Sequence, residues 1–214
     1  DSIDDFAAIS MIATTPFMLI VHPSLPAKSV RELVALAKSR PGQINYASPG
    51  AGTAAHLAAE MFRVGAGIDI VHIPYKGVSQ ALIDTVAGAT QVMILSPITA
   101  LPQVKAGKVR ALAVTTARRS NALPELPTMQ ESGIARYEFT SWYGLLAPRA
   151  VPAPTIARLN EAVGKALQQK DLRAKLAAEA AEPAGGTPEQ FAALLKQEVK
   201  RFSDLVRQIK LQVD

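Results

Sequence analysis

Between Pro41 and Thr116 the sequence alternates short runs rich in β-branched residues with longer segments of helical periodicity. Such alternation is typical of successive βαβ units, in which the strands join one parallel sheet and the helices cover its faces. The chain is therefore expected to be an α/β protein. The runs predicted to be strands cover residues 43–47, 69–73, 91–95 and 110–115.

Three helices are predicted between these strands. The first has an apolar face, because small and large apolar residues recur at the spacing of one helix side. These residues are Ala54, Leu57, Ala58, Met61 and Phe62. The other two helices cover residues 78–86 and 98–105, and glycine follows the end of each helix, as is common where a helix stops.

The flanks of this region carry further signals. Ser29 and Glu32 have the spacing of a capping box, which predicts a helix that ends near Arg40. Residues 6–22 are apolar and β-branched but are interrupted at Pro16, so two strands joined by a kink are expected, and the kink is a candidate crossing between lobes. A strand is predicted at residues 139–146, and helices at residues 155–169, 171–179 and 188–211.

Composition excludes several classes of protein. No run approaches the roughly 18 apolar residues of a transmembrane helix, and the absence of cysteine excludes disulfides and thiolate catalysis. The 23 basic and 18 acidic residues are dispersed and aromatic residues make up only 5%, so no nucleic-acid partner is predicted. The N-terminus lacks the basic and apolar segments of a signal peptide, so an exported protein would be represented here without its leader.

The most informative segment leaves a predicted strand at Tyr46, turns through small residues and enters a helix at Ala54. Glycines let a backbone approach a ligand, and the first amides of a helix have no intrahelical partner and attract anions. Ser48 and Thr53 add hydroxyls that can donate to a carboxylate. The alternative is a tight turn in which Thr53 only caps the helix. The candidate ligand-binding residues here are Ser48, Gly50, Ala51, Gly52, Thr53, Ala54 and His56.

Two other strand ends belong to the same edge of the predicted sheet, where open α/β sheets bind their ligands. Tyr75 and Lys76 follow one strand, and Ser96 follows the next. Tyr75 can supply an aromatic wall and a hydroxyl, Lys76 a cation and Ser96 another donor. Each also has a structural alternative: Lys76 as a solvated loop residue and Ser96 as a helix cap.

Catalytic and cofactor motifs are missing from these segments. The Gly-rich turn is neither a phosphate-binding P-loop nor a dinucleotide fingerprint. Ser48 is not in a nucleophile elbow, because Tyr46 stands where the first glycine would be. The three histidines lack metal-ligand spacing, and no carboxylate pair flanks the turn. The sequence therefore predicts no catalytic residues, no metal and no cofactor, and the chain is expected not to be an enzyme.

Several segments in this order resemble the Bug family, the periplasmic solute-binding proteins of tripartite tricarboxylate transporters. They are residues 46–53 (YASPGAGT), 56–58 (HLA), 72–77 (HIPYKG), 106–114 (AGKVRALAV), 126–128 (LPT), 141–144 (SWYG) and 147–148 (AP). The resemblance runs nearly from end to end. Its ordered combination is specific, although each piece alone is not.

The resemblance implies a periplasmic binding-protein fold with two α/β lobes and a hinge. Residues 13–136 would form the second, inserted lobe, and residues 1–12 and 137–214 the remaining part of the first. It also implies capture of a small carboxylate (a di- or tricarboxylate, an acidic amino acid or an aromatic acid) between one loop of each lobe, with residues 48–53 as the second-lobe loop. The implied partners are the membrane subunits of a secondary transporter, and contact with the membrane would come only through docking to them.

Family members begin with a strand and a Pro- and Gly-rich loop that precede the point at which this sequence opens. The first lobe is therefore expected to be N-terminally truncated here, as a fragment, a processed form or a natural truncation. An alternative function follows from that expectation. A truncated lobe with a bare apolar face could act as a non-transport module that binds a partner or signals.

Overall fold

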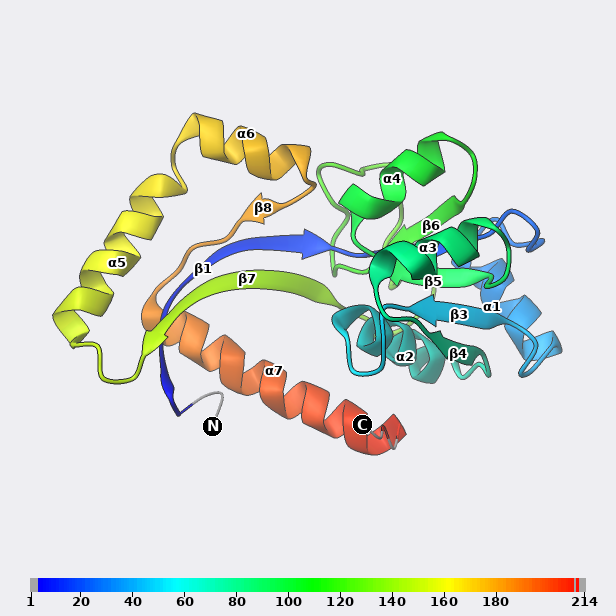
Figure 1. Ribbon diagram of the computed structural model, residues 1–214, viewed down its shortest axis with the longest axis horizontal. Helices are drawn as coiled ribbons and strands as arrows, with labels where there is room; N and C mark the ends of the chain where they lie inside the picture. The colour runs from blue at the N-terminus through cyan, green and yellow to red at the C-terminus, as the bar shows by residue number, and fades with distance from the viewer. Residues whose placement is uncertain (1–3, 210, 212–214) are drawn as a thin grey trace. The chain divides into compact units, whose positions relative to one another are not determined.

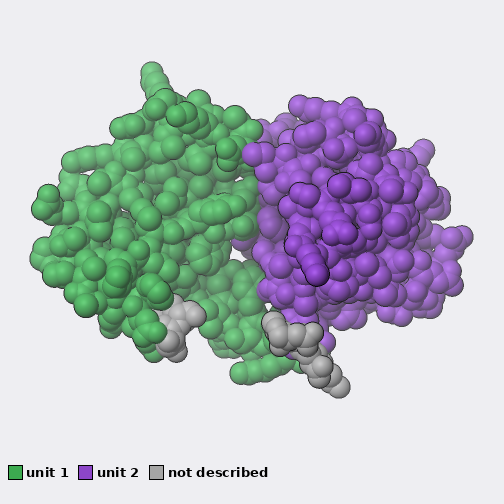
Figure 2. Space-filling view, viewed as in Figure 1, with its two compact units in different colours: residues 1–15, 141–208 green, residues 16–140, 209–214 purple. Residues whose placement is uncertain are grey.

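The computed structural model describes residues 4–209 and 211 of the 214-residue chain. The chain forms two compact units (Figure 2). Unit 1 contains the chain up to Thr15 and Ser141–Gln208, and unit 2 contains Pro16–Thr140 and the chain from Ile209. The kink expected at Pro16 thus coincides with a passage between the units. The predicted lobes, with boundaries at residues 13 and 136, are parts that would move as rigid bodies. These boundaries stay a prediction.

Unit 2 is built on a five-stranded sheet with the order β4-β3-β5-β2-β6. β3 pairs in parallel with both β4 and β5, as the βαβ pattern predicts. β2 lies antiparallel between β5 and β6. The strands are β2 (Met18–Val21), β3 (Asn45–Ser48), β4 (Val71–Pro74), β5 (Val92–Leu95) and β6 (Arg110–Val114).

The antiparallel position of β2 corrects the expectation of an entirely parallel sheet. All four residues of Met18–Val21 are completely buried. A run that is apolar on both faces belongs in the middle of a sheet, where it is covered above and below. Hydrophobicity thus indicates a central strand, but it carries no information about strand direction or neighbours.

Four helices cover this sheet: α1 (Val30–Ser39), α2 (Ala54–Ala66), α3 (Val78–Val86) and α4 (Pro97–Lys105). The predicted cap at Ser29 is confirmed, because its side chain accepts a hydrogen bond from the amide of Glu32 at 3.2 Å. α3 and α4 lie together over one face of the sheet (Figure 1). Their Ala81, Leu82 and Ala100 join the buried core with Met18 and Met93 of the sheet.

Unit 1 contains a three-stranded sheet with the order β7-β1-β8. β1 (Phe6–Pro16) pairs antiparallel with the two-residue β8 (Glu182–Pro183), and β7 (Thr140–Pro148) is the predicted strand that follows unit 2. The two strands predicted in residues 6–22 are confirmed, since β1 ends at Pro16 and β2 begins at Met18.

The helices of unit 1 are α5 (Ala153–Ala166), α6 (Lys170–Ala178) and α7 (Pro188–Ile209). Thr187 and Gln190 form a reciprocal capping box at the start of α7, with bonds of 2.9 and 3.2 Å. The predicted end of this helix at residue 211 lies beyond the last helical residue that the structure describes. No helix within the described residues is long and apolar enough to cross a membrane.

Candidate ligand-binding site

The Gly-rich loop, residues 49–53, joins β3 to α2 at the carboxyl end of β3. Gly50 and Gly52 adopt φ of 139° and 75°, a region that side chains disfavour. A Cβ at Gly50 would also lie 3.3 Å from the carbonyl oxygen of Tyr75. Both glycines are therefore required by the backbone path of the loop.

Two hydroxyls expected to face a ligand form hydrogen bonds within the loop instead. Ser48 is completely buried, and its Oγ donates to the Gly50 carbonyl at 3.1 Å. Thr53 Oγ1 donates to the same carbonyl at 2.8 Å and accepts from the amide of His56 at 3.4 Å. Thr53 is thus the N-cap of α2. A contact of either hydroxyl with a ligand stays a prediction.

Backbone amides of the loop remain available. Within the described residues, the amides of Ala51, Ala54 and Ala55 donate no hydrogen bond to the protein. Ala51, Gly52 and Ala54 are exposed, so an anion can approach the first turn of α2 from solvent. Unpaired amides at a helix N-terminus attract negative charge through both hydrogen bonding and the helix dipole.

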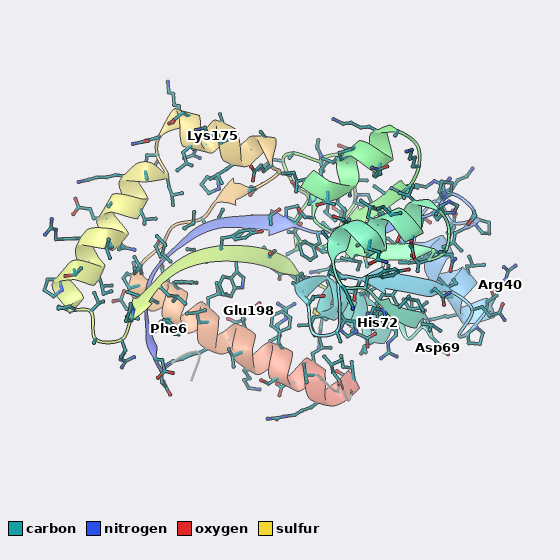
Figure 3. The ribbon with its side chains drawn as sticks, viewed as in Figure 1. Phe6, Arg40, Asp69, His72, Lys175 and Glu198 are labelled. Atoms are coloured by element: carbon teal, nitrogen blue, oxygen red, sulfur yellow. The ribbon has the colours of Figure 1, made fainter. Side chains whose placement is uncertain are left out.

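Three aromatic rings stack behind the loop. The ring centroid of His72 lies 4.0 Å from that of His56 and 4.9 Å from that of Tyr46. Tyr46 and His72 are paired residues on β3 and β4, and His56 comes from the first turn of α2. Figure 3 labels His72 in this part of unit 2. His56, which was predicted to be a ligand-binding residue, is buried, and its contact with a ligand stays a prediction.

Each of the two stacked histidines is hydrogen-bonded to the loop or to Ser48, the residue before it. The amide of Gly52 donates to His56 Nδ1 at 3.1 Å, and His72 Nε2 lies 2.6 Å from Ser48 Oγ. No role in the site was predicted for His72. The register of β3 and β4, which places it opposite Tyr46, brings it to the site.

An ion pair supports the stack. Tyr46 donates its hydroxyl to Glu60 Oε1 at 2.6 Å, and Arg63 forms a bidentate bond to the same carboxylate, with Nε–Oε1 and Nη2–Oε2 distances of 2.9 and 2.7 Å. Glu60 is buried. Burial opposes its ionisation, but the bonds from Arg63 and Tyr46 outweigh that effect and hold the pKa of Glu60 below its usual range.

The same surroundings favour neutral forms of the three stacked rings. Burial and the Glu60 carboxylate raise the pKa of Tyr46. Burial lowers the pKa of His56, and burial together with the neighbouring His56 lowers the pKa of His72 to about 4. At neutral pH the rings behind the loop therefore carry no charge, and the ionised pair beneath them is Glu60 with Arg63.

The other predicted residues lie at the same sheet edge, since β4 and β5 both run parallel to β3. Tyr75 donates its backbone amide to the Ser48 carbonyl at 3.0 Å, while its hydroxyl donates to Asp84 on α3 at 2.8 Å. Lys76 is exposed, in agreement with the alternative prediction of a solvated loop residue. Ser96 is the N-cap residue of α4, but its hydroxyl makes no capping bond.

Among residues 4–209 and 211, no group of three or more acidic, His or Cys side chains is arranged to hold a metal.

Solved structures of binding proteins share this fold. A Rhodopseudomonas palustris protein solved with adipate is 34% identical with a TM-score of 0.87, and the match covers 99% of this chain and 71% of that one. A second protein from that organism, solved with bound malate, is 29% identical with a TM-score of 0.80 over 95% and 70% of the two chains. The periplasmic binding protein BugD is 28% identical with a TM-score of 0.84 over 99% and 72%. The chain thus has the fold of periplasmic solute-binding proteins.

The sequence gives the family. The model of the tripartite tricarboxylate transporter family receptor matches residues 1–211, and the chain belongs to that family. The curated relative BugT of Bordetella pertussis is 32% identical over 206 residues, which are 96% of this chain and 63% of BugT. The predicted resemblance to Bug proteins is confirmed. The chain spans less than two thirds of the length of the curated relatives BugT and a Pseudomonas protein that is 35% identical.

Proposed function

We propose that this chain captures a small organic carboxylate, with the Gly-rich loop as its anion-binding element. The observation that carries the proposal is the set of exposed, unpaired amides where residues 49–53 enter α2. A carboxylate placed there would accept hydrogen bonds from Ala51 and Ala54 and would lie at the positive end of the helix dipole. The adipate and malate of the two solved relatives are ligands of this chemical class.

We expect backbone amides, more than side chains, to hold the ligand. The hydroxyls of Ser48 and Thr53 shape the loop through the Gly50 carbonyl, so the amides become the principal donors. Lys76, exposed after the adjacent strand, would add positive charge near the same sheet edge. Recognition through backbone amides selects for a carboxylate group but not for the rest of the molecule. Di- and tricarboxylates, acidic amino acids and aromatic acids are therefore all candidate ligands.

The family supports a transport role. We infer that the whole protein works in the periplasm and presents its bound carboxylate to the membrane subunits of a tripartite tricarboxylate-type transporter, without catalysing a reaction. Binding without chemistry needs only preorganised donors, and the loop is preorganised by its two positive-φ glycines and its internal bonds.

The experiment that tests capture is thermal unfolding of the full chain in the presence of mono-, di- and tricarboxylates, acidic amino acids and aromatic acids. A ligand at about 100 times its Kd stabilises a protein by about 2.7 kcal/mol, which raises Tm by roughly 5 to 10 °C for a chain of this size. Calorimetric titration of the best ligand then gives its Kd.

Two glycine variants make the experiment specific for the loop. Gly50→Val forces a side chain into a disfavoured φ and against the Tyr75 carbonyl, so binding should be lost. Gly77→Ala is the matched control on the next loop, because a Cβ there has no neighbour within 4 Å and the φ of 167° is ordinary extended backbone. Unchanged affinity in a folded Gly50→Val variant would remove this loop from the function.

A further inference from the structure

The two stacked histidines connect the Gly-rich loop and the residue before it to the interior of unit 2. His72 contacts Ser48, which precedes the loop, and His56 contacts Gly52 within the loop. Because His56 Nδ1 accepts the Gly52 amide, that nitrogen carries no proton. His72 Nε2 and Ser48 Oγ lie 2.6 Å apart and share a hydrogen bond in which either can donate. The Gly52 contact therefore specifies the neutral tautomer of His56, with its proton on Nε2.

A positive charge on His56 or His72 would not be well stabilised by the surrounding groups. The rings are stacked with centroids 4.0 Å apart, so a proton on one opposes a proton on the other. Among the described residues, the charged groups that act on the rings are Glu60 and Arg63 of α2, with the phenol of Tyr46 from β3 stacked on His72. The Glu60 carboxylate already accepts from Tyr46 and Arg63, and its charge is offset by the guanidinium.

Protonation of His56 reverses the direction of its bond to the loop. An imidazolium has N–H donors at both ring nitrogens, so Nδ1–H would face the Gly52 N–H and the hydrogen bond would be lost. Two facing donors in a buried place are unfavourable, and the loop residue is the one with room to move, because Gly52 is exposed. Proton uptake at this site would therefore displace the tip of the loop.

We propose that His56, stacked on His72, forms a proton-sensitive latch, in which residues 49–53 keep their anion-binding conformation only while the ring of His56 is neutral. The latch is closed at neutral pH and opens in acid, in agreement with the lowered pKa of both imidazoles. The predicted movement of the loop in acid rests on the hydrogen bonds and the stacking of the two histidines. Its consequence for ligand capture, weaker binding in acid, rests on the proposed function.

Nuclear magnetic resonance tests the latch without any ligand. The chain has three histidines, and His22, which bonds to Ser24 outside the stack, serves as an internal comparison. Ring nitrogen shifts of ¹⁵N-labelled protein report the protonation and tautomer of each histidine, and the backbone amide of Gly52 reports the loop. Between about pH 7.5 and pH 4, we expect Gly52 to shift with the midpoint of His56. A Gly52 amide that stays unchanged while His56 titrates, a charged His56 at pH 7, or rings that never take up a proton in the folded protein would each overturn the latch.

A conservative variant separates the proton from the packing. In His56→Asn, the amide oxygen takes the place of Nδ1 as acceptor but cannot titrate. We expect the Gly52 amide of His56→Asn to keep its neutral-pH position and to lose its acid response. His56→Ala, which removes the acceptor, should shift Gly52 at every pH. An acid response of Gly52 that is the same in His56→Asn as in the natural chain would contradict the latch.

Ligand binding supplies the second readout. The carboxylate that stabilises the chain most is titrated into the natural chain and His56→Asn at about pH 7.5 and pH 5. Ionisation of the ligand affects both proteins equally, so the difference between them isolates the protein's own protons. Affinity should fall more in the natural chain, by up to about tenfold per pH unit below the His56 midpoint. If no carboxylate binds at any pH, the proposed function fails, and the Gly52 measurement decides the latch by itself.

Discussion

The phenyl ring of Phe191 occupies the space that a side chain at Gly144 would need. A Cβ built on Gly144 collides with the ring, which extends from α7 onto β7 and is almost completely buried. Trp142, two residues earlier on the strand, meets the same ring edge to face at a centroid distance of 5.6 Å. The glycine thus lets α7 approach the sheet of unit 1.

The first prediction concerns this contact. Gly144→Ala should destabilise the chain by about 2 kcal/mol, because the ring must leave its position in a filled core. Chemical unfolding followed by circular dichroism measures the loss. Gly164→Ala is the control: it lies in α5 with nothing near its Cβ, and it should be neutral or gain up to about 1 kcal/mol from helix propensity. Equal stabilities for the two variants would show that Phe191 tolerates a methyl group at position 144.

The second prediction concerns the carboxylate beneath the stack. Glu60→Gln should destabilise the chain by about 2 kcal/mol, because the partly buried Arg63 loses its counter-charge. Tyr46→Phe keeps the ion pair and removes one hydroxyl, so its cost should be about 1 kcal/mol. Urea unfolding of both variants gives these values. A Glu60→Gln variant as stable as the natural chain would contradict this prediction. It would mean that the attraction between Glu60 and Arg63 only balances the cost of removing the two charges from water.

The third prediction is a pH dependence of stability. In the folded chain the pKa of His72 is lowered from 6.5 to about 4, so between these values the unfolded chain binds more protons and stability falls as pH falls. The contribution is intact above pH 6.5 and is lost progressively down to about pH 4. The loss from this group should be about 2 kcal/mol, discounted because the ring is only partly buried.

Unfolding midpoints across this pH range test the third prediction. His72→Gln retains a polar group for Ser48 but cannot titrate, so its stability should fall less steeply in acid. His22→Gln, which removes an imidazole outside the stack, is the matched control. Identical pH slopes in the natural chain and His72→Gln would contradict the assignment of this proton to His72.

Local sequence signals predicted much of the fold and part of the site. The strands and helices of residues 41–116, the cap at Ser29 and the loop glycines depend on neighbours in the chain, and each was found. The direction of β2 and the stack of His56 on His72 depend on register between distant elements, which periodicity does not encode. The hydroxyls of Ser48 and Thr53 show a related limit. Short polar side chains next to a turn often bond to the nearby backbone, and here the Gly50 carbonyl accepts from both.

The antiparallel β2 has a consequence for how unit 2 folds. β2 is the first strand of this unit in the chain, yet its partners on β5 and β6 lie more than 70 and more than 85 residues further along. Closing such long loops is entropically costly and slows folding. During synthesis, therefore, β2 has no strand partner in this sheet until β5 has emerged, and its other edge has none until β6 has emerged. The pairing of Met18 with Val114 is therefore expected to form late, although it involves the strand that is made first.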